Sequence, residues 1–105
     1  MKKIPQSLLI INNQVGLRDH ISEGEYQGKS FRDLGDYLYE KHEDRVKELL
    51  EELENAIDLE ERMKFFKFEY NDETGSRVTI SQDEKVEDIV SITDTVFWYI
   101  GPMGG

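Results

Sequence analysis

Apolar residues in this chain gather in short runs, and the spacing within them changes from strand-like to helix-like and back. Residues 8–11 are continuously apolar, which is typical of a buried strand. Residues 12–16 are rich in types that tolerate left-handed backbone conformations and predict a turn. Residues 17–22 predict a return strand, and residues 23–28 predict a loop. The chain is therefore expected to begin with a hairpin.

Helical spacing follows from residue 30 onward. Ser30, with Asp33 three residues later, resembles an N-cap with an acidic residue in the first turn. The stretch 40–45 is entirely polar and separates two apolar groups. This pattern fits one long helix or two helices that meet near His42, and we favour two because one helix would be long for a globular protein. The apolar positions are Leu34, Leu38, Val46, Leu49, Leu50, Leu53 and Ile57.

A second hairpin is expected in the other half of the chain. Residues 63–70 are aromatic and partly alternating, which indicates a strand, and 77–81 alternate as its return strand. The turn at 71–75 lacks the acidic spacing and distal Glu of a calcium loop. A polar connection over 82–91, with a short helical turn, is anchored by Val86, Ile89 and Val90.

The last apolar run, residues 96–100, is β-branched or aromatic throughout and predicts a well-buried strand. Trp98 and Tyr99 in this run are candidates for the core and the sheet face, and one of them for a partner-binding patch. The spacer Gly101, Pro102 and Met103 ends the strand, and Gly104 and Gly105 follow. Chance gives two glycines at two set positions roughly once in two hundred chains. A frayed end is therefore the plain alternative to a functional diglycine.

The order of elements (hairpin, helix, hairpin, short connection, last strand) is that of the β-grasp fold. In that fold the first and last strands are parallel central neighbours, and here those two strands are the most apolar. We expect an α+β domain over residues 1–100, with a mixed sheet of four to five strands packed on one or two helices. Residues 101–105 are expected to form a flexible C-terminal diglycine tail.

The tail resembles that of the β-grasp sulfur carriers and ubiquitin-like modifiers. Asp94-x-Val96, an apolar run, a proline-containing spacer and Gly104-Gly105 carry the resemblance. The resemblance implies that an adenylyltransferase of the ubiquitin-activating type adenylates the Gly105 carboxylate with its own ATP and Mg²⁺. A thiocarboxylate for sulfur donation or a thioester for conjugation to lysine then follows, so a sulfurtransferase or target proteins are further partners.

Composition narrows the remaining possibilities. The 105 residues carry a net charge of −10, which argues against nucleic-acid or anionic-membrane binding. Cysteine is absent, which excludes disulfides and Cys-based nucleophiles. No apolar run reaches the roughly 18 residues of a membrane span, and the basic start lacks a long enough apolar region for a signal peptide. A cytoplasmic protein is expected.

The sequence offers no enzyme-like chemistry of its own. His20 and His42 are far apart and are more typical of surface or interdomain polar residues than of ligands. No Gly-rich loop follows a strand in the phosphate-binding pattern, so no cofactor is assigned to this chain. The alternative function is an acidic non-covalent module, such as a phage-type inhibitor or antitoxin, that covers a basic partner surface. Residues added after Gly105 would leave that function intact.

Overall fold

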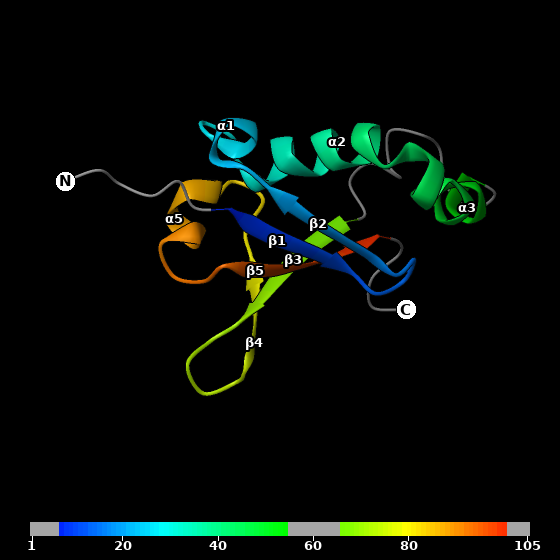
Figure 1. Ribbon diagram of the computed structural model, residues 1–105. Helices are drawn as coiled ribbons and strands as arrows, with labels where there is room; N and C mark the ends of the chain where they lie inside the picture. The colour runs from blue at the N-terminus through cyan, green and yellow to red at the C-terminus, as the bar shows by residue number, and fades with distance from the viewer. Residues whose placement is uncertain (1–6, 55–65, 101–105) are drawn as a thin grey trace.

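The computed structural model describes residues 7–54 and 66–100, and it has an α+β architecture (Figure 1). One five-stranded mixed sheet packs against helices, of which four lie in the described residues. The strands are β1 Leu8–Asn12, β2 Leu17–Ile21, β3 Phe66–Asn71, β4 Arg77–Ile80 and β5 Thr95–Ile100. The helices are α1 Glu23–Tyr26, α2 Phe31–Lys41, α3 Glu43–Glu54 and α5 Val86–Val90.

The sheet order is β2-β1-β5-β3-β4, so the first and last strands lie side by side at its centre. They run parallel, with Leu9 opposite Thr95 and Ile11 opposite Phe97, whereas the other neighbouring pairs are antiparallel. The expectation that these two strands are parallel central neighbours is confirmed. Both predicted hairpins are also present, and their turns contain Gly16 and Gly75 at positive φ.

The helical segment is two helices, as expected, with the break at His42. The Ser30 side chain accepts a hydrogen bond from the Asp33 backbone N–H at 3.2 Å and caps α2. Val46 of α3 is fully buried, whereas the positions of the predicted stripe beyond residue 54 lie outside the described residues. No helix in the described parts of the chain is long and apolar enough to cross a membrane.

The loop predicted over residues 23–28 is wrong over residues 23–26, where α1 forms one helical turn. The Ser22 backbone N–H donates to Glu25 Oε2 at 2.7 Å, which is half of a capping box. Burial of Tyr26 anchors the turn. The Ser-x-x-Glu spacing was visible in the sequence, but Gly24 inside it favoured a loop.

The core lies between the sheet and the helices, and the expectation of a well-buried last strand holds for one face of β5. Along β5 the side chains of Val96, Trp98 and Ile100 are buried, whereas Phe97 and Tyr99 are only half-buried. The helices α1, α2 and α3 lie on one side of the sheet (Figure 1). Since no described helix covers the opposite side, alternate residues of β5 face outward.

Candidate functional site

The predicted activation site and its spacer, Gly101, Pro102, Met103, Gly104 and Gly105, lie outside the described residues. The described chain ends at Ile100, the last residue of β5. The site that can be built from contacts is therefore the end of β5 and the sheet face beside it.

A side-chain amide holds the end of β5 in place. Gln14, in the β1–β2 turn, donates from Nε2 to the Ile100 carbonyl oxygen at 2.6 Å. Its Oε1 accepts the Ile100 backbone N–H at 2.7 Å. One carboxamide thus satisfies both backbone groups of the residue that precedes the predicted tail.

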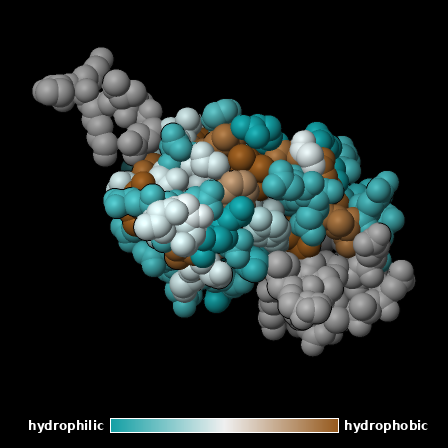
Figure 2. Space-filling view, turned by 90° about the horizontal axis from the view of Figure 1, so that it is seen from below, coloured by the Kyte–Doolittle hydropathy of each residue, from teal (hydrophilic) through white to brown (hydrophobic). Residues whose placement is uncertain are grey.

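The side of the sheet that no described helix covers carries aromatic and charged side chains in register. We term it the open face, and it includes Lys67, Glu69, Arg77, Phe97 and Tyr99. Phe97 and Tyr99 of β5 pair with Glu69 and Lys67 of β3. Arg77 of β4 lies opposite Asn71 of β3 and reaches across to β5. Figure 2 views the molecule from this side and shows brown apolar patches interrupted by teal hydrophilic surface. Partly exposed aromatic residues beside cations are a common composition for a protein-binding surface.

Arg77 organises the centre of the open face. Its guanidinium lies 4.0 Å from the centroid of the Phe97 ring, and its Nη1 donates to the Tyr99 hydroxyl at 2.9 Å. The Glu69 carboxylate forms ion pairs with Lys67 at 3.0 Å and Arg77 at 3.7 Å. The Glu69 side chain is only 13% exposed, against 40% for Arg77, so the cations are the more accessible charges.

Comparison with known proteins does not assign the chain to a family. No family model matches the chain, and no curated protein matches it either.

A second charged cluster joins β2, α1 and α2 on the helical side. Lys41 Nζ lies 2.9 Å from Glu25 Oε1 and 3.0 Å from Asp19 Oδ2. The Tyr37 hydroxyl donates to Glu25 at 2.5 Å, and His42 Nε2 lies 2.7 Å from Asp19. The cluster ties the strand to both helices, and it gives His42 a partner within the fold.

These contacts shift the pKa values of the cluster. The hydrogen bond from Tyr37, followed by those from Ser22 and Lys41, lowers the pKa of Glu25 to about 2. Burial alone would lower the pKa of Lys41, but the hydrogen bonds to Glu25 and Asp19 outweigh it and raise this pKa. Because a lysine must lose its proton to attack an acyl group, Lys41 is a poor nucleophile and acts as a structural ion.

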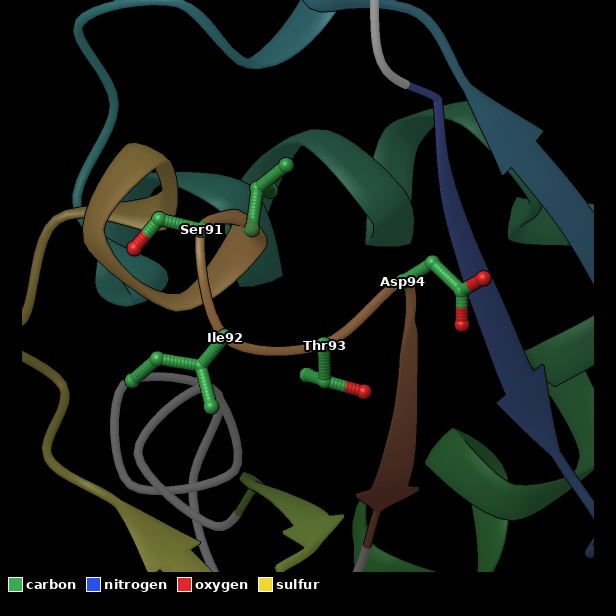
Figure 3. A pocket seen from close by; sticks show the side chains of 5 residues that line it. Ser91, Ile92, Thr93 and Asp94 are labelled. Atoms are coloured by element: carbon green, nitrogen blue, oxygen red, sulfur yellow. The ribbon is translucent and has the colours of Figure 1, made fainter.

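A surface depression lies along the connection between α5 and β5 and is shown in Figure 3. Its lining comes from one continuous segment, residues 90–94. The hydroxyl of Ser91 donates to the Asp88 carbonyl at 2.6 Å, and that of Thr93 donates to the Thr95 carbonyl at 3.3 Å. Since these hydroxyls already donate to nearby backbone carbonyls, the depression makes a weak ligand site. Ile92, 63% exposed, leaves part of it apolar.

The described residues contain no group of three or more His, Cys, Asp or Glu side chains placed to hold a metal ion. Sequence reasoning did not identify Gln14 and Arg77. Gln14 sits in a turn, where polar residues are ordinary. Only the register that brings β4 beside β3 places Arg77 near β5. Tyr99, considered earlier for a partner-binding patch, does lie on the open face, whereas Trp98 is fully buried.

Proposed function

We propose that this chain is a β-grasp carrier or modifier protein whose Gly105 carboxylate is activated by an adenylyltransferase of the ubiquitin-activating type. One observation supports the proposal above all: the first and last strands are parallel neighbours at the centre of a mixed five-stranded sheet. This is the strand arrangement expected of the β-grasp fold. The diglycine follows the last strand by only a three-residue spacer.

The chemistry would be supplied jointly by the tail and its enzyme. A free carboxylate is a poor acyl donor because it carries negative charge and lacks a good leaving group. Attack of the Gly105 carboxylate on the α-phosphorus of ATP would release pyrophosphate and form an acyl-adenylate. A sulfur nucleophile would then displace AMP, giving a thiocarboxylate or a thioester. Glycine suits a narrow catalytic crevice because it has no Cβ.

The open face is the surface that we assign to the activating enzyme. β5 carries Phe97 and Tyr99 on this face and leads directly into the tail. An enzyme that receives the tail must therefore approach the end of this strand. Lys67 and Arg77 give the open face a basic character within a protein of net charge −10. A matching enzyme surface would carry carboxylates around an apolar centre.

The acidic binding module remains a second candidate because α3 exposes a row of carboxylates. Glu43, Asp44, Glu48 and Glu51 are all exposed. This row would suit a basic partner, and such binding would weaken as salt rises. It needs neither Gly105 nor ATP, which makes the two functions separable.

Intact mass spectrometry tests the carrier function. The chain is incubated with a candidate adenylyltransferase, such as one encoded beside it, and with ATP and Mg²⁺. We expect an AMP adduct, or a replacement of oxygen by sulfur when a sulfur donor is present. Gly105→Ala should fold normally and give neither product. An unmodified mass with several such enzymes would contradict the carrier function and favour the acidic module.

A further inference from the structure

The two central strands, β1 and β5, end at different levels in the sheet, so the end of β5 extends beyond its neighbour. β1 stops at Asn12, one residue beyond Ile11, whose partner is Phe97. β5 continues to Ile100. Without β1 alongside it, the last residue of β5 would have backbone groups with no strand partner on that side.

The hydrogen bonds between β1 and β5 show which way the backbone groups of Ile100 point. The Leu9 backbone N–H donates to the Asp94 carbonyl oxygen at 2.8 Å, so Asp94 presents its carbonyl to β1. Backbone groups of alternate residues in a strand point to the same side, and Ile100 is therefore also directed toward the β1 side. The Gln14 carboxamide occupies that side and supplies one donor and one acceptor, as a strand residue would.

The turn itself fixes the position of Gln14. Asn12 is fully buried, and its Oδ1 accepts the Gln14 backbone N–H at 2.9 Å. The contacts therefore run from a buried strand residue, through the turn, to the end of β5. Exposed termini usually fray, and an anchor of this kind prevents fraying at the last strand residue.

We infer that Gln14 is a positioning residue that fixes the point at which the carrier tail leaves the fold. This inference rests on the proposed function. With Ile100 anchored, five residues of sequence separate the last strand residue from the Gly105 carboxylate, and five residues span at most about 17 Å. A released Ile100 would lengthen the free segment and lower the effective concentration of the tail end at the enzyme.

Amide hydrogen exchange of Ile100 tests the anchor without any enzyme. In Gln14→Leu both hydrogen bonds are lost, and we expect the Ile100 amide to exchange at least tenfold faster while core amides such as Trp98 are unchanged. Gln14→Glu can still accept the Ile100 N–H but cannot donate to its carbonyl, so a smaller increase is expected. Gln27→Glu, the same change at an exposed position of the helical side, is the matched control. Unchanged Ile100 exchange in Gln14→Leu would overturn the anchor.

Adenylation kinetics test the positioning role. For Gln14→Leu we expect the KM for the carrier to rise by about 1.3-fold with kcat unchanged, because the free segment lengthens from five to six residues and the chemistry is not altered. A fall in kcat alone, or no change in either constant, would overturn the role. If the unsubstituted protein is not adenylated, the carrier function fails and the positioning role fails with it. Ile100 exchange still decides separately whether the anchor exists.

Discussion

The two faces of the sheet use the same residue types for different purposes. On the covered face, Trp98 is fully buried and stacks with Phe68 at a centroid distance of 6.5 Å. On the open face, Phe97 is the adjacent residue of the same strand, yet its ring lies under a guanidinium and is half-buried. One residue along β5 separates a side chain that stabilises the fold from one that is accessible to a partner.

This difference follows from the period of a strand, since successive side chains point to opposite faces. The covered face gains free energy from removing apolar area from water, whereas the open face keeps most of its contacts exposed. Substitutions on the covered face should therefore lower stability. Those on the open face should mainly alter binding.

The largest difference in stability is expected between substitutions of Trp98 and Phe97, which are neighbours on β5. Trp98→Ala should lower the free energy of unfolding by about 3–5 kcal/mol, because it leaves a cavity between the sheet and α2. Phe97→Ala should lower it by about 1 kcal/mol or less. Urea denaturation followed by circular dichroism measures both values. Equal losses would show that the open face is as important to the fold as the core.

A smaller loss of stability is expected from a substitution at Gly35, where α2 approaches the sheet. A Cβ added at Gly35 would lie 2.5 Å from two atoms of the Phe66 ring. Gly35→Ala should therefore cost about 1–3 kcal/mol by overpacking, despite the better helix propensity of alanine. Gly24→Ala, whose new Cβ would have only Ser22 Oγ at 4.0 Å, serves as the control. Thermal denaturation compares them, and a stabilised Gly35→Ala would show that Phe66 moves easily.

The covered face was more predictable from the sequence than the open face. Apolar runs identified β1 and β5, and turn residues located both hairpins, because burial and backbone conformation restrict residue type directly. The helix α1 was missed because Gly24 inside it favoured a loop and one turn is too short to show helical periodicity. Partners such as Gln14 with Ile100, or Arg77 with Phe97, depend on register between distant segments, which residue types alone do not encode.

Low pH should weaken the charged cluster on the helical side, because Glu25 then takes up a proton. Its pKa falls from 4.5 to about 2 in the folded protein, so its contribution to stability is complete above pH 4.5 and is lost between pH 4.5 and 2. Because the group is partly exposed, we expect this contribution to be on the order of 1 kcal/mol. In Glu25→Gln the unfolding free energy should vary less with pH across that window. An unchanged pH dependence in chemical denaturation would contradict the assignment.

The smallest effect on stability, and the most specific effect on function, is expected at Arg77. Arg77→Gln should change the free energy of unfolding by less than about 0.5 kcal/mol. It should weaken binding to the activating enzyme, and this difference should shrink at high salt. Arg32→Gln, on an exposed arginine of α2 paired with Asp83 at 3.5 Å, is the matched control. Isothermal titration calorimetry measures the affinity of each variant for the activating enzyme. Equal affinities of the two variants would contradict the assignment of the open face as the docking surface.

The parallel pairing of β1 with β5 also has a consequence for biosynthesis. The sheet centre requires β1 and also β5, which is made only after residue 94. While β5 is still missing, β1 and β3 would each expose a hydrogen-bonding edge, and nascent fragments would be open to aggregation and proteolysis. The sheet can therefore be completed only in chains that contain β5, and a fragment that ends before residue 95 would lack its central strand.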